Sequence, residues 1–152
     1  MAFEGLAFAN GLSCNADDTQ LYFNASFVGP CAWDLDADGT LGPQRRLAEQ
    51  YDCDGIALDA AGNIWISGFS SPELLCLSPE GDEIARLPLP GEACTNVRFG
   101  GADMRDIYVT MVTHAGAKAL TEGRMPDALD SVLYNGRSPA VGAPVARAGF
   151  QL

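Results

Sequence analysis

The sequence contains few basic residues and a single histidine. Nine Lys and Arg stand against twenty Asp and Glu, which gives a net charge of −11 at pH 7. A surface of this sign repels phosphate backbones and anionic lipids, so we expect no nucleic-acid or membrane-surface partner. It attracts divalent cations, although many ordinary proteins are equally acidic. His114 is the only histidine available to a Ser-His or Cys-His mechanism, and no G-x-S-x-G elbow accompanies it.

The sequence also lacks a signal-peptide pattern, long apolar runs and closely spaced cysteine pairs. No segment approaches the roughly 18 apolar residues of a membrane span, and Glu4 stands where a signal peptide carries basic residues. The five cysteines have no C-x-x-C spacing, which argues against a disulfide framework and a thiolate zinc site. No G-x-G-x-x-G pattern indicates a dinucleotide. We therefore expect a cytoplasmic protein with free, mostly buried thiols.

A repeated strand-turn-strand unit organises what is present. Residues 54–67 read as an acidic residue, a short apolar strand, a tight turn and a second apolar strand. Similar units begin at Asn10 and Asn96, at spacings of 44 and 42 residues. This period falls within the roughly 40 to 45 residues of a propeller blade. We predict an all-β half-propeller domain over 1–152, with three four-stranded blades at approximately 10–50, 54–90 and 96–150.

Turn residues divide each blade into its strands. The expected strands cover residues 11–14, 20–24, 31–35 and 44–48 in the first blade, 56–58, 64–67, 73–77 and 83–87 in the second, and 97–99, 107–110, 131–134 and 144–147 in the third. Trp33 and Trp65 occupy strand positions and are expected in the core. The insertion from Thr113 to Asp130 is expected to be a rim or lid segment, because long loops inside compact repeats are often functional or mobile.

An acidic stretch in the first blade matches the opening of an EF-hand calcium loop. Asp34, Asp36, Asp38 and Gly39 have the required D-x-D-x-D-G spacing. The bidentate Glu at position 12 is replaced by Arg45, and the flanking segments read as strands. An Asp-Gly hairpin turn accounts for the pattern better, with the calcium loop as the alternative.

Three blades do not close a propeller ring. Propellers close with about four to eight blades, because each sheet must bury both faces against neighbours. The chain is therefore either a fragment of a longer propeller or a protomer that completes its ring with a second copy. We favour a homodimer, in which two three-bladed halves give six blades and cover both open flanks.

Three motifs resemble the SMP-30/gluconolactonase/luciferin-regenerating-enzyme (LRE)-like family. They are residues 8–13, residues 53–59 with 62–65, and residues 99–101 with 106–110. The resemblance covers nearly the whole chain, but only the C-terminal half of a family member. It implies a six-bladed propeller that holds one divalent metal at the mouth of its central channel. It also implies a hydrolase of sugar lactones or similar cyclic esters.

The resemblance implies specific metal ligands. The family binds its metal through a Glu of the first blade, an Asn that starts a middle blade and an Asp that starts the next. The motifs assign the latter two roles to Asn10 and Asp54, while the Glu has no counterpart because its blade is missing. Calcium is the first expectation, with zinc, magnesium or manganese as alternatives. Such a cation can polarise a lactone carbonyl and activate a bound water, whose proton Asp54 can take.

Other interpretations of these residues stay open. Asn10 and Asp54 each precede a glycine and can simply begin strands after turns. Asn96, next to Thr95, occupies the equivalent place in the third blade, and it is with His114 a candidate polar contact at the channel mouth. A solvated loop position is the alternative for His114. For the whole chain, the competing hypothesis is a non-catalytic three-bladed module or fragment that acts in assembly or interaction.

Overall fold

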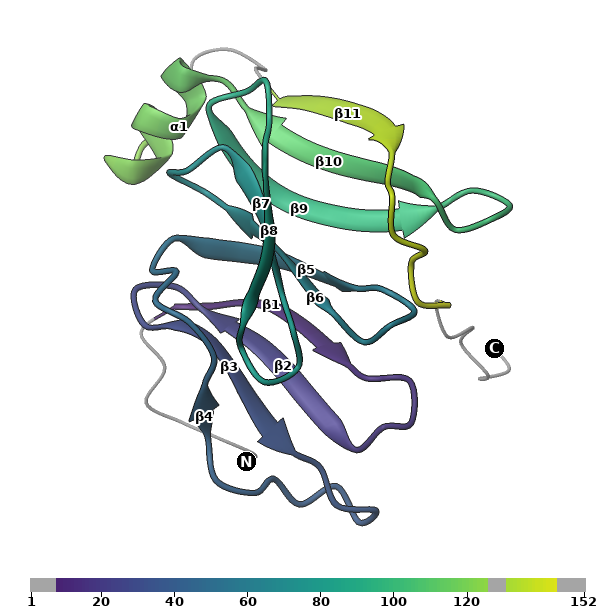
Figure 1. The fold of residues 1–152 in the computed structure, drawn as a ribbon. Helices are drawn as coiled ribbons and strands as arrows, with labels where there is room; N and C mark the ends of the chain where they lie inside the picture. The colour runs from purple at the N-terminus through teal and green to yellow at the C-terminus, as the bar shows by residue number, and fades with distance from the viewer. Residues whose placement is uncertain (1–7, 126–130, 145–152) are drawn as a thin grey trace, which may run out of the picture.

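This computed structural model describes residues 8–125 and 131–144, which contain three antiparallel sheets (Figure 1). The first sheet contains β1 (Ala9–Cys14), β2 (Gln20–Ala25), β3 (Gly29–Asp34) and β4 (Arg45–Arg46) in that order. The second contains β5 (Cys53–Leu58), β6 (Ile64–Gly68), β7 (Glu73–Leu77) and β8 (Glu83–Pro88). The third contains β9 (Ala93–Gly100), β10 (Asp106–Val112) and β11 (Ser131–Arg137), with β10 in the middle.

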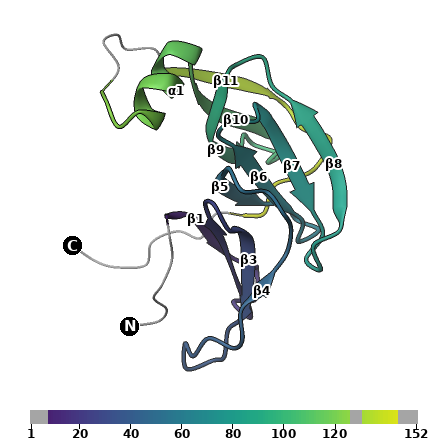
Figure 2. The ribbon, with the colours of Figure 1, turned by 90° about the vertical axis from the view of Figure 1, so that its left-hand side faces the viewer.

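The sheets fan out as an arc whose inner side is formed by β1, β5 and β9 (Figure 2). These inner strands approach one another so closely that glycine is required at two positions. A Cβ atom at Gly11 would lie 2.6 Å from the carbonyl oxygen of Asp54, and one at Gly55 would lie 2.5 Å from Cα of Asn96. The glycines therefore let the starts of the three strands meet at one end of the arc.

The second sheet is buried on both faces. Alternate residues of its strands contribute to two apolar clusters, so Ile56 packs toward the first sheet and Ala57 toward the third. Trp65 contacts Phe99 of the third sheet edge to face, with ring centroids 5.7 Å apart. Burial on both sides explains the nearly continuous apolar runs of β6 and β7, which a half-exposed strand would not carry.

The predicted all-β, three-bladed architecture is confirmed by these sheets. Trp33 and Trp65 are both 3% exposed, and four of the five free cysteines are buried. Residues 34–42 form a hairpin-like turn in which Asp36 and Thr40 are joined by a backbone hydrogen bond and Gly39 has a positive φ of 85°. The turn interpretation of this acidic stretch is therefore confirmed, and Asp34, Asp36 and Asp38 are exposed.

Some strand bounds differ from those expected. The strand predicted over 44–48 is reduced to β4, although the amide of Leu47 still donates to the carbonyl of Pro30. The last predicted strand, 144–147, falls almost wholly outside the described residues. The insertion contains a short helix, α1 (His114–Thr121), whose Ala119 is buried. In the part of the chain that the structure describes, no helix has the length and hydropathy needed to cross a membrane.

Candidate metal and catalytic site

A β-bulge interrupts each inner strand near its start. The strand register shifts at residues 10–11 of β1, at 54–55 of β5 and at Thr95 of β9. Bulges bend a strand, re-aim its side chains and are frequent next to functional sites. Their repetition places Asn10, Asp54 and Thr95 at equivalent positions on three neighbouring strands, at the same end of the arc.

The structure brings the two predicted metal ligands onto adjacent strands. Asn10 lies on β1 and Asp54 on β5, and both side chains are half-buried. The Gly11 backbone touches the Asp54 backbone, so the two bulges are in direct contact. The Asn10 amide nitrogen donates to Ser26 Oγ across 2.7 Å. Local sequence explains this placement, because the Asn-Gly and Asp-Gly pairs supply a functional side chain followed by a residue without Cβ.

Asp54 is the more unusual of the two residues electrostatically. Burial raises the pKa of its carboxyl group to about 6, and the nearby negative charge of Asp52 adds to the shift. Within residues 8–125 and 131–144, no donor forms a hydrogen bond or ion pair with this carboxylate. Asp52, by contrast, accepts bonds from the amides of Ser70 and Ser71. A desolvated carboxylate without a partner is typical of a site that receives a ligand or a proton.

Polar residues on the second strands hold the bulges in place. The Asn24 amide nitrogen donates to the carbonyl oxygens of Asp54 and Gly55, at 2.9 and 3.1 Å. Ser67 Oγ accepts a 2.8 Å bond from the Gly55 amide. The sequence analysis missed these supporting residues. In the structure, Asn24 and Ser67 are both fully buried. The sequence signal that could have identified them is a polar side chain among the apolar residues of a predicted strand.

The two remaining candidates occupy different places. Asn96 is register-equivalent to Gly11 and Gly55, while Thr95 takes the position of Asn10 and Asp54. The exposed Asn96 side chain accepts a 2.9 Å hydrogen bond from the amide of Val97. His114 begins α1 one residue after β10, whose last residue, Val112, pairs with the first residue of β9. The His114 backbone therefore lies at the same end of the arc as Asp54. Its side chain is not among those that the structure describes.

The donor chemistry fits part of a divalent-metal site. An amide oxygen and a carboxylate are hard ligands of the kind that calcium and magnesium bind. Calcium takes about six to eight oxygens, so two residues supply only a fraction of its coordination shell. Among the described residues, no group of three or more His, Cys, Asp and Glu side chains could hold a metal ion. Further ligands would be water, backbone oxygens, neutral side-chain oxygens, or groups from chain outside residues 8–125 and 131–144.

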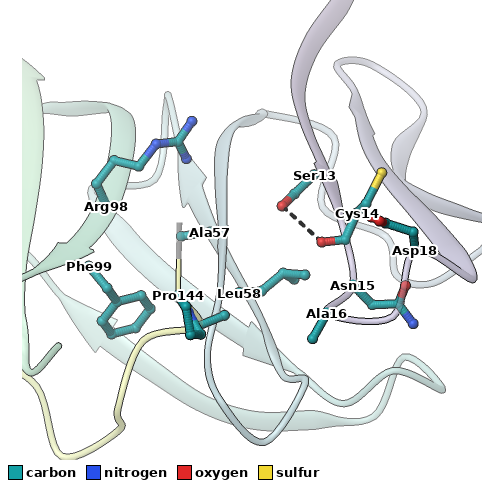
Figure 3. Close-up of a pocket in the computed structure, with 11 residues that line it drawn as sticks. Ser13, Cys14, Asn15, Ala16, Asp18, Ala57, Leu58, Arg98, Phe99 and Pro144 are labelled. Atoms are coloured by element: carbon teal, nitrogen blue, oxygen red, sulfur yellow. Dashed lines mark hydrogen bonds between the residues drawn. The ribbon is translucent and has the colours of Figure 1, made fainter. Parts of the chain in front are cut away.

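A hollow of about 370 Å³ lies at the other ends of the inner strands (Figure 3). It is lined by Ser13, Cys14, Asn15, Ala16, Asp18, Ala57, Leu58, Arg98, Phe99, Ala143 and Pro144. The Arg98 guanidinium donates to the carbonyl oxygens of Ile56 in β5 and Val97 in β9. This hollow is separate from the Asn10 and Asp54 end of the strands.

Comparison with known proteins identifies relatives of much of this chain. Residues 1–113 match the SMP-30/Gluconolactonase/LRE-like region. Pentonolactonase XacC of Haloferax volcanii is 29% identical over 126 residues, which cover 78% of this chain and 43% of the relative. The 6-deoxy-6-sulfogluconolactonase of Pseudomonas putida is 38% identical over 81 residues, which cover 50% and 28% of the two chains.

A solved structure shares the fold. The calcium-binding protein regucalcin of Agrobacterium tumefaciens superposes with a TM-score of 0.74 and 24% identity, and the match covers 97% of this chain and 52% of regucalcin. The chain spans less than half the length of the two curated lactonases that it matches. Because the family match includes all of the first two sheets and both bulges that carry Asn10 and Asp54, the chain belongs to the SMP-30/gluconolactonase/LRE-like family.

Proposed function

We propose that this chain contributes the Asn10 and Asp54 ligands to the divalent-metal site of a hydrolase that opens sugar lactones or similar cyclic esters. The observation that carries the proposal is the desolvated Asp54 carboxylate, which has no partner among the described residues and lies on a bulge that touches the bulge of Asn10. Two relatives named as lactonases support the substrate class. Calcium is the proposed metal, with zinc, magnesium and manganese as alternatives, and the cytoplasm is the proposed location.

The two side chains have distinct roles in this proposal. A bound cation would polarise the lactone carbonyl and lower the pKa of an attacking water. Asn10 provides a neutral oxygen donor, which binds without adding charge. Asp54 provides a negative donor, and its carboxylate accepts the proton that the attacking water releases. In the metal-free protein, burial makes this carboxylate more basic than one in water.

Completion of the ring by a second copy is part of the proposal. The first and third sheets each have a face that no other described sheet covers, and apolar side chains lie on these open flanks. Leu12 is 56% exposed on β1, and Leu133 is 67% exposed on β11. A two-fold arrangement that packs the first sheet of each copy against the third sheet of the other would cover both. Two Asn10 and two Asp54 would then share one central channel.

Turnover of a simple aldonolactone tests the enzymatic proposal. We expect hydrolysis that requires a divalent cation, stops in chelator and falls at least 100-fold in Asp54→Asn. Asp38→Asn is the matched control, because it removes an exposed carboxylate from a hairpin turn far from β5. Full turnover by a folded Asp54→Asn variant would contradict the proposal.

The small donor set also supports a second candidate function. A chain with two of the required oxygens can serve as a non-catalytic propeller module that acts in assembly, with Asn10 and Asp54 kept as strand starts. This alternative predicts full thermal stability in chelator and no lactone turnover under any metal condition. The turnover assay and a melting curve in chelator therefore separate the two functions.

A further inference from the structure

Ser26 links the two proposed metal ligands through a chain of hydrogen bonds. Its hydroxyl accepts a 2.7 Å bond from Asn10 Nδ2 and donates a 2.7 Å bond to the carbonyl oxygen of Cys53, the residue before Asp54. Ser26 is only 7% exposed. The Asn10–Ser26–Cys53 relay therefore runs through the interior between the first two sheets and joins the two bulges.

The direction of these bonds fixes the orientation of the Asn10 amide. A serine hydroxyl has one proton, and here that proton is engaged by the Cys53 carbonyl, which can only accept. The hydroxyl oxygen must therefore accept from Asn10, and the amide must present its NH₂ group to Ser26. The Asn10 carbonyl oxygen is then turned away from Ser26. With the relay intact, the amide cannot flip without losing its partly buried hydrogen bond to Ser26.

We propose that Ser26 is a positioning residue, which presents the Asn10 oxygen to the metal site and couples Asn10 to the Asp54 bulge. This inference rests on the proposed metal-binding function. Outer hydrogen bonds of this kind orient metal ligands, and their loss typically lowers metal affinity about 10–100-fold. Asn24 supports the same junction from two residues away on β2, by its bonds to the Asp54 and Gly55 carbonyls.

The positioning can be measured without metal. In the metal-free protein, nuclear magnetic resonance should show the Asn10 side-chain amide proton that donates to Ser26 protected from exchange and resolved from those of exposed amides. Ser26→Ala should remove this protection, and Ser26→Thr, which keeps the hydroxyl, should restore it. Ser138→Ala is the matched control, since Ser138 is also 7% exposed and its hydroxyl accepts from the Ala140 amide, away from both bulges.

Calcium titration by calorimetry then connects the orientation to ligand binding. We expect Ser26→Ala to weaken Ca²⁺ binding about 10–100-fold, and Ser26→Thr and Ser138→Ala to stay within about threefold of the wild type. Circular dichroism confirms that each variant is folded. Unchanged Asn10 amide protection in Ser26→Ala, or unchanged Ca²⁺ affinity in that variant, would overturn the inference.

A different result would count against the proposed function alone. If the wild type shows a protected Asn10 amide that depends on Ser26, yet binds no Ca²⁺, the relay positions Asn10 and the metal proposal fails. The metal-free spectrum and the titration therefore distinguish the two claims.

Discussion

The Asp59 carboxylate accepts a 3.0 Å hydrogen bond from the indole Nε1 of Trp65 at the turn between β5 and β6. The same carboxylate accepts bonds from the amides of Ala61 and Asn63 and from the Asn63 side chain. Asp59 is 4% exposed, and its bond to Trp65 is buried, while those from Ala61 and Asn63 are partly buried. One side chain thus closes the turn and satisfies the polar atom of a core tryptophan.

Asp59→Ala should therefore lower the free energy of unfolding by about 2–4 kcal/mol, because it leaves the indole and two amides without a buried partner. Urea unfolding followed by tryptophan fluorescence measures the change. Asp82→Ala is the control, since this exposed turn residue should stay within about 0.5 kcal/mol of the wild type. Equal stability of the two variants would show that the turn network contributes little.

Asp54 should reduce the stability of the protein near neutral pH. Its folded-state pKa of about 6 lies above the ordinary aspartate value, so the folded chain holds the proton more tightly than the unfolded chain. The protonated Asp54 side chain therefore adds to the free energy of unfolding below about pH 4, and this contribution is lost as the pH rises from about 4 to about 6. In chelator, Asp54→Asn should gain about 1–2 kcal/mol at pH 7 and almost nothing at pH 4. A gain that does not depend on pH would refute this explanation.

Gly55→Ala should disrupt the contact between the second and third sheets. The added methyl group would lie 2.5 Å from Cα of Asn96 and 2.9 Å from the Thr95 carbonyl oxygen, where backbone cannot easily move. We expect a loss of about 1–3 kcal/mol from this overpacking. Gly136→Ala on β11 is the control, because its nearest neighbour would be 4.0 Å away. Thermal melts of the two variants should therefore differ by several degrees.

The proposed pairing of two copies depends on the open flanks. Leu12→Asp and Leu133→Asp each place a charge on an exposed apolar position, so neither should harm the fold of a single copy. Both should convert a dimer to a monomer at micromolar concentration, as measured by light scattering after size exclusion. Ile84→Asp on the outer strand β8 is the control and should remain dimeric. A monodisperse wild-type monomer would contradict the pairing itself.

The repeat period was sufficient to predict the sheets. The pattern of residues 54–67 predicted β5, the following turn and β6, because apolar strands and a glycine turn at Gly62 are local features of the sequence. Sequence spacing also placed Asn10 and Asp54 at equivalent strand starts. It did not show that Thr95, rather than Asn96, is their register equivalent, since a bulge of one residue is set by strand pairing.

The hydrogen bonds that hold Asn10 and Asp54 in place could not be predicted from the sequence. The role of Ser26 depends on which carbonyl of the neighbouring sheet meets its hydroxyl, and that carbonyl lies 27 residues away in the chain. The sequence predicted an insertion at α1 but no helix. Gly116 and the threonines at each end weaken the helical pattern. The metal-binding role of Asn10 and Asp54 stays a prediction.

Calcium titration of the wild type and Asp54→Asn at several pH values tests the central claim most directly. The account predicts saturable Ca²⁺ binding that weakens about tenfold per pH unit below pH 6, because protons then compete for the Asp54 carboxylate. It also predicts that Asp54→Asn, folded and at least as stable as the wild type, loses this binding. Absence of binding in the wild type, or equal binding by the two proteins, would contradict the account.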